Sequence, residues 1–149
     1  MNPMSRLTAI ALIVLLTGYL PPVDAQTNEA SVWQGVYTTV QADAGKVLFA
    51  QHCASCHADK AGASAGHDAA PAIVGAGFRE RWLDASIADI FDTVRQTMPV
   101  AAPNSLSPQE YADLTAFILA LNEYPAGTRV LQADAYDAML DTFIDPAPE

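Results

Sequence analysis

The cysteines of this 149-residue chain are the residues whose spacing most clearly suggests chemistry. Cys53 and Cys56 are the only two in the chain, two residues separate them, and His57 directly follows the second. Thiols at this spacing could form a disulfide, act as a redox dithiol, bind zinc with further ligands, or attach a haem covalently. In the last case the thiols add to the porphyrin vinyl groups, and the adjacent histidine ligates the iron.

The sequence disfavours three of these four chemistries. Structural zinc sites usually take four Cys or His ligands in two spaced pairs, whereas here only His52 and His67 accompany the motif. We expect both of them to face solvent, with His67 as an alternative iron ligand. A thioredoxin-like dithiol needs a βαβ context, and one disulfide is a thin framework for a small exported domain. Covalent haem attachment is therefore the favoured interpretation.

The N-terminal segment has the layout of a secretory signal peptide. Arg6 precedes an apolar run over residues 9–16, and small residues lead to Ala25. The run is shorter than the roughly 20 apolar residues of a membrane-spanning helix. We therefore expect cleavage after Ala25 and export to the periplasm, where covalent haem attachment takes place. Retention of residues 1–25 as a membrane anchor is the alternative.

The charge of the chain restricts its partners. The formal net charge is −10, and it stays so after loss of residues 1–25, which contain one basic and one acidic residue. Nucleic acids and anionic membrane surfaces repel such a protein, so neither is an expected partner. A basic patch on a partner protein is the better electrostatic match.

Three helices are predicted, each with a capping box at its start. The first begins at Thr38 with Gln41, and its apolar positions are Val40, Ala44, Val47 and Leu48. The second begins at Ser86 with Asp89 and ends at Met98, because Pro99 disfavours helical geometry before it; its apolar positions are Ile87, Ile90, Phe91 and Val94. The third begins at Ser107 with Glu110, has Leu106 and Tyr111 as a hydrophobic staple, and buries Leu114, Phe117, Ile118 and Leu121.

The remaining segments give weaker signals, and no strand pattern of any length is present. Residues 26–37 are interpreted as a flexible leader and residues 58–70 as a loop, while residues 71–78 have no clear periodicity. One short amphipathic turn is expected around residues 131–140. The predicted organisation is a signal peptide at 1–25, the leader, one all-α domain at 38–126, and a tail at 127–149 that packs on or near the domain.

Met98 is the candidate for the second axial ligand of a haem iron. After removal of residues 1–25 only Met98 and Met139 remain as methionines. Thioether sulfur is an axial ligand in cytochromes c. Met98 lies where a helix ends and a loop begins, so its side chain can turn toward a flat cofactor, whereas Met139 is expected in the core or on the surface.

Taken together, residues 38–124 resemble class I c-type cytochromes. The shared order is a helix, CxxCH, a proline-led segment, a middle helix, Met-Pro and a C-terminal helix. The resemblance implies the cytochrome c fold around one haem c attached through Cys53 and Cys56. It also implies that Gly45 and Phe49 cross a face containing Leu114 and Phe117, and that the carbonyl of Pro71 accepts a hydrogen bond from His57.

A narrower resemblance covers FRERWLDASIADIFDTVRQTMPVAAPNSLSPQEYADLTAFILALNEYPAG, which is similar to the cytochrome modules that serve periplasmic quinoprotein dehydrogenases. The chain departs from them at Asn104 and Glu123, where glycine is frequent. The family places haem-propionate donors where Trp82 and Arg79 or Arg81 stand. Haem-packing residues are then expected among the apolar side chains Ile73, Val74, Phe91, Val94 and Leu106.

The function expected from these features is one-electron transfer without a catalytic residue. The haem would accept electrons from a dehydrogenase and pass them to a downstream oxidase or cytochrome. Two alternatives remain: a permanent electron-transfer subunit of a dehydrogenase complex, and a haem enzyme or gas sensor whose sixth iron position is open.

Overall fold

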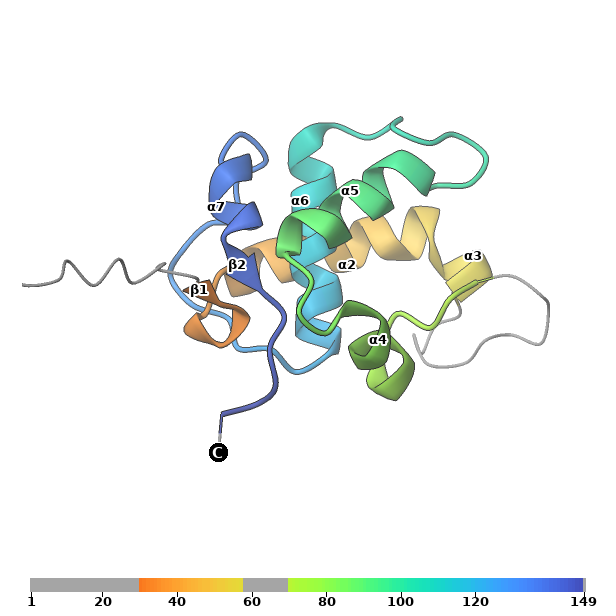
Figure 1. Ribbon diagram of the computed structural model, residues 1–149. Coiled ribbons are helices and arrows are strands. Elements are labelled where there is room, and N and C mark those ends of the chain that lie inside the picture. Colours follow the sequence, from red (N-terminus) through yellow and green to blue (C-terminus); the bar gives the residue numbers. More distant parts are fainter. Residues whose placement is uncertain (1–29, 58–69, 149) are drawn as a thin grey trace, which may run out of the picture.

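The computed structural model describes residues 30–57 and 70–148, and this part of the chain is mostly helical (Figure 1). The elements in chain order are β1 (Ala30–Ser31), the 3-10 helix η2 (Val32–Gln34), α2 (Thr39–His52), α3 (Ala54–His57), α4 (Gly75–Trp82), α5 (Ile87–Thr97), α6 (Pro108–Leu121), α7 (Tyr136–Leu140) and β2 (Thr142–Phe143). The all-α class is therefore confirmed. None of the helices described here is long and apolar enough to cross a membrane.

The three predicted helix starts are confirmed. At each one, the N-cap side chain accepts a hydrogen bond from the N–H of the residue three positions later, whose side chain bonds back to the N-cap N–H. These local bonds satisfy backbone donors that a helix leaves unpaired at its N-terminus. The pairs are Thr38 with Gln41, Ser86 with Asp89, and Ser107 with Glu110.

Helices α2 and α6 cross closely at Gly45, as the resemblance implies. A Cβ atom added to Gly45 would lie 2.8 Å from the Cβ of Phe117 and would collide with the carbonyl of Asp113. Beside this point the rings of Phe49 and Phe117 have centroids 5.4 Å apart. Only glycine lets the two backbones approach to this distance, which accounts for a helix-breaking residue inside α2.

The apolar stripe predicted for the first helix is wrong. Val40 and Val47 are 78% and 57% exposed, and the buried face contains Gln41, Ala42, Gly45 and Phe49. The two faces differ by one residue, which is a rotation of about 100° around the helix axis. Close approach at Gly45 decides the rotation. The buried side-chain amide of Gln41 is satisfied by the backbone of Leu131: its NH2 group donates to the Leu131 carbonyl oxygen and its oxygen accepts from the Leu131 N–H, both at 2.8 Å.

The interpretation of residues 26–37 as a flexible leader is wrong for residues 30–37. Val32 and Tyr37 are buried in the core, and β1 pairs in parallel with β2 near the other end of the chain. The indole N–H of Trp33 donates to the carbonyl oxygen of Asp145 at 3.0 Å, and the Ser31 hydroxyl donates to the Asp145 carboxylate at 2.9 Å. A few apolar side chains among polar ones thus hold this segment in place. Residues 26–29 lie outside the described part.

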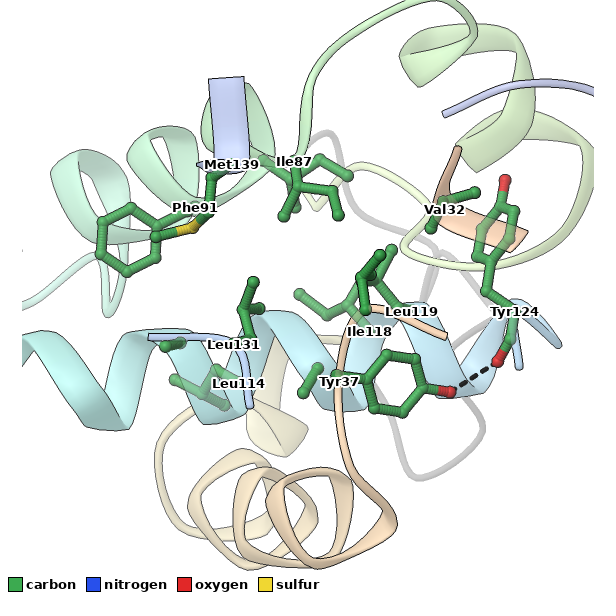
Figure 2. Packing of buried hydrophobic residues seen from close by; sticks show 14 of the residues in the cluster. Val32, Tyr37, Ile87, Phe91, Leu114, Ile118, Leu119, Tyr124, Leu131 and Met139 are labelled. Carbon is green, nitrogen blue, oxygen red and sulfur yellow. Dashed lines mark hydrogen bonds between the residues drawn. The ribbon is translucent and has the colours of Figure 1, made fainter. Parts of the chain in front are cut away.

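The segment after α6 also belongs to the packed structure. Leu131, Met139 and Ile144 are buried, α7 packs against α5, and Met139 lies beside Phe91 and Ile87 (Figure 2). Together with β1 and β2, α7 forms the side of the molecule opposite α3 (Figure 1). Met139 is accordingly a core residue at this side, distant from the CxxCH motif.

Candidate functional site

Most of the functional residues predicted from the sequence line one cavity between α2, α4, α5 and α6. It encloses about 660 Å³ of space, its open mouth included, and Cys53, His57 and Met98 all contribute to its wall. Most of the remaining lining is apolar, with Phe49, Ile73, Phe78, Ile90, Leu114 and Ile118 among its residues. Small-molecule and cofactor sites commonly have this character, a largely apolar concavity with a few polar groups.

The end of α2 and the short helix α3 place the motif at this cavity. Cys53 is the C-cap of α2 and donates its N–H to the carbonyl oxygen of Phe49 at 2.9 Å. The N–H of His57 in turn donates to the carbonyl oxygen of Cys53 at 3.0 Å. Cys56, inside α3, is exposed, and both thiols are free. The tight turn therefore puts Cys53 and His57 on one wall, with Cys56 outside the lining.

Burial changes the pKa values of two of these groups. It raises the pKa of the Cys53 thiol, and the neighbouring Cys56 adds to the rise. Reactive redox cysteines have a lowered pKa instead, so this thiol lacks the activation that a redox dithiol requires. Burial lowers the pKa of His57, partly offset by a hydrogen bond to the backbone of Pro71. The neutral imidazole favoured in this way is the form that ligates metals.

Pro71 and His57 both line the cavity, and the effect of the Pro71 backbone on the pKa of His57 points to the hydrogen bond that the resemblance implies. Proline has no backbone N–H, so the acceptor in such a bond is the Pro71 carbonyl. Such a bond orients a ligating histidine and makes it a stronger ligand. The segment containing Pro71 is itself held by α6. The buried Asn122 side chain donates to the carbonyl oxygen of Ile73 at 2.8 Å and accepts from the N–H of Gly75 at 3.1 Å.

Met98 reaches the same cavity from the end of α5. It is the C-cap residue in extended geometry, which ends the helix before Pro99, and its side chain is half-buried. Its N–H donates to the carbonyl oxygen of Val94 at 2.8 Å. The structure thus places an imidazole and a thioether, which lie far apart in the sequence, on the wall of one cavity.

Helix α4 brings Arg81 and Trp82, but not Arg79, to the cavity. Phe78, Arg81 and Trp82 lie three and four positions apart and so share one helix face. The guanidinium of Arg81 lies 5.3 Å from the centre of the Trp82 ring. Arg79 directly follows Phe78, so its side chain leaves the helix about 100° around the axis from Phe78. It lines a separate groove together with Tyr124 and Asp145. Arg79 therefore does not line the cavity, whereas Arg81 does; a role of either arginine as a haem-propionate donor stays a prediction.

Sequence reasoning found only part of the apolar lining. Ile73 and Val94 line the cavity as expected, whereas Val74, Phe91 and Leu106 do not. Phe78 and Ile90 were missed as lining residues. Phe78 belongs to α4, a helix too short for apolar periodicity to reveal. The spacing of four residues between Phe78 and Trp82 is nevertheless a signal that both lie on one helix face. Asn122 was missed because its partners are distant in the sequence.

The residues of the cavity fit a covalently attached haem. Apolar walls suit a flat macrocycle, Cys53 offers a thiol at the wall, and His57 and Met98 offer nitrogen and sulfur, two known iron ligands. Within residues 30–57 and 70–148 no group of three or more His, Cys, Asp and Glu side chains could hold a metal ion, so the zinc interpretation gains no support there. His52 is exposed, as expected, and His67 lies outside the described residues.

Comparison with known proteins gives one match. The family model described as "Cytochrome C oxidase, cbb3-type, subunit III" matches residues 40–118, more than half of the chain. The matched region contains Cys53, Cys56, His57 and Met98, and it includes α3, α4, α5 and most of α2 and α6. Neither among curated proteins nor among solved structures was a match found.

Proposed function

The chain belongs to the cytochrome c family described as "Cytochrome C oxidase, cbb3-type, subunit III", and from this membership we propose that it is a periplasmic monohaem electron carrier with His57 and Met98 as its iron ligands. Membership itself means that the chain carries a covalent haem c and transfers electrons. The location, the ligand pair and the redox partners are the proposed parts.

The observation that carries the ligand assignment is that His57 and Met98 line the same apolar cavity. When bound, the haem supplies a one-electron ferric/ferrous couple. The chain's part is to hold the His57 ring through Pro71, to present the Met98 thioether, and to keep water away with side chains such as Phe49 and Leu114. Burial and thioether ligation both favour the ferrous state, which raises the reduction potential.

Replacement of Met98 tests the ligand assignment. We expect Met98→Ala holoprotein to lose the near-infrared band from thioether ligation to ferric iron, to have a lower reduction potential, and to bind carbon monoxide readily when reduced. Met139→Leu is the matched control, because Met139 is buried on the opposite side of the molecule and does not line the cavity. If Met98→Ala leaves the spectrum of the holoprotein unchanged, Met98 is not a ligand.

The wild-type spectrum also separates the carrier from a haem enzyme or gas sensor. A carrier with both axial positions filled shows the thioether band and binds carbon monoxide slowly. Absence of the band, combined with ready binding of carbon monoxide to the reduced wild type, would establish an open sixth position. The mass of the mature protein is the companion measurement, because it reports cleavage after Ala25 and the added mass of one haem together.

We propose a periplasmic dehydrogenase, of the quinoprotein type, as the electron donor, and an oxidase or another cytochrome as the acceptor. The support is the resemblance of residues 78–127 to modules that serve such dehydrogenases, and the net charge of −10, which suits a basic docking surface. Reduction by such a dehydrogenase should slow as ionic strength rises. Salt-independent rates, or no reduction by a quinoprotein dehydrogenase, would exclude this donor.

A permanent place in a larger complex is the second candidate. The matching family model is described as an oxidase subunit, which favours a subunit of an oxidoreductase over a free shuttle. Purification of the native protein distinguishes the two. A subunit stays with its complex through size-exclusion chromatography, whereas a shuttle elutes at the mass of its own chain.

A further inference from the structure

Tyr111 contacts the main chain of Met98 from the neighbouring helix α6. The tyrosine side chain is fully buried, and its hydroxyl donates a hydrogen bond to the carbonyl oxygen of Met98 at 2.9 Å. The N–H of Met98 is bonded to the carbonyl oxygen of Val94 in α5 at 2.8 Å. Both polar backbone groups of Met98 are therefore bonded, one by α5 and the other by α6.

The loop that follows Met98 comes back to the same hydroxyl group. The N–H of Leu106 lies 3.5 Å from the Tyr111 oxygen, at the long limit of a hydrogen bond. Between these ends, Arg95 accepts a bond from the N–H of Asn104 and donates one to its side chain, both at 2.9 Å. The middle of the loop is thus tied to α5 by Arg95, and its Met98 end is tied to α6 by Tyr111.

We propose that Tyr111 is a positioning residue that keeps the Met98 thioether directed toward the haem iron, an inference that rests on the ligation by Met98 proposed above. Tyr111 is not part of the cavity lining, so it acts through the Met98 backbone. Helix α6 also supplies Leu114 and Ile118 to the lining. One rigid helix therefore sets the position of the Met98 backbone relative to the cavity.

The size of the expected effect follows from the value of one hydrogen bond. Opening of the iron–sulfur contact competes with closure, and an added ligand such as imidazole binds only the open form. Loss of the Tyr111 hydroxyl removes a bond that holds the closed form. A net value of about 1 kcal/mol for that bond corresponds to about fivefold tighter apparent binding of imidazole.

The test is titration of ferric holoprotein with imidazole, comparing Tyr111→Phe with the wild type. Tyr37→Phe is the matched control, because Tyr37 is also buried and its hydroxyl also donates to a backbone carbonyl, that of Tyr124 (Figure 2), away from the cavity. We expect Tyr111→Phe to bind imidazole about fivefold more tightly than the wild type, while Tyr37→Phe stays within twofold. Denaturant unfolding should show a similar loss of stability in both variants, as each loses one hydrogen bond from a buried tyrosine to a backbone carbonyl.

One outcome would refute the positioning role of Tyr111, and another would refute the ligation of the iron by Met98. If Tyr111→Phe binds imidazole no more tightly than Tyr37→Phe, or if neither variant binds it, then Tyr111 has only a structural role. If Met98→Ala leaves the wild-type spectrum unchanged, the ligation by Met98 fails, and the inference about Tyr111 fails with it. A lower reduction potential in Tyr111→Phe than in Tyr37→Phe is the second expected readout, because a weakened thioether ligand raises the potential less.

Discussion

Replacement of Gly45 by alanine tests how tightly α2 and α6 pack. The added methyl group would collide with the Asp113 carbonyl and lie 2.8 Å from the Cβ of Phe117. A backbone carbonyl cannot swing aside as a side chain end does, so the helices have to separate. Overpacking of this kind costs about 1–3 kcal/mol, and the rigid obstacle points to the upper end of that range.

The helix propensity of alanine offsets part of this cost. Alanine is more favourable than glycine inside a helix by about 1 kcal/mol. The expected net effect on the free energy of unfolding is therefore a loss of about 2 kcal/mol. For a domain of this size that loss lowers the melting temperature by roughly 8 °C.

Gly77→Ala provides the matched control for this experiment. Gly77 lies inside α4, and a Cβ atom there would be 3.4 Å from the Cβ of Ala72, which is an ordinary contact. This variant should be neutral or gain up to about 1 kcal/mol from helix propensity. Both variants are compared with the wild type by thermal and denaturant unfolding of the holoprotein. A Gly45→Ala protein as stable as Gly77→Ala would refute the close crossing, and with it the explanation for the rotation of α2.

Two further predictions concern side chains that the sequence did not single out. Asn122→Leu removes the hydrogen-bond partners of the Ile73 carbonyl and the Gly75 N–H. The variant should be less stable by about 2 kcal/mol, since each buried polar group left unpaired costs about 1–3 kcal/mol. Equal stability of variant and wild type in urea unfolding would show that water replaces the amide without loss. Tyr136 donates to the Asp92 carboxylate, and this hydrogen bond raises the pKa of the phenol above its ordinary value. A phenol whose pKa is raised in the folded state stabilises the fold at pH values below its ordinary pKa, and this contribution is lost as the pH rises through the raised pKa. The wild type should therefore lose more stability than Tyr136→Phe in strongly alkaline solution. Parallel profiles of stability against pH for the two proteins would contradict this.

The predicted helix starts and the location of the site illustrate what sequence reasoning reaches. A capping box joins residues three positions apart, so Ser107 and Glu110 determine a helix start almost independently of the rest of the fold. Residue type likewise made Cys53, His57 and Met98 the candidates, and the structure brings all three to one cavity. The segment at 30–37 was misjudged, because its few apolar side chains are buried only by contacts with the distant tail.

The sequence by itself determined the chemistry of this protein: two thiols and an imidazole within five residues, a thioether before a proline, and the helices that contain or end at them. Tertiary structure alone decided which face of α2 is buried, that Arg81 rather than Arg79 meets the cavity, and that Tyr111 holds the backbone of Met98. The physical reason is the distance along the sequence between the interacting residues. Caps and motif spacings depend on neighbours along the chain, whereas these contacts depend on how elements distant in the sequence pack together: α2 against α6 at Gly45, α4 against the cavity, and α6 against the end of α5.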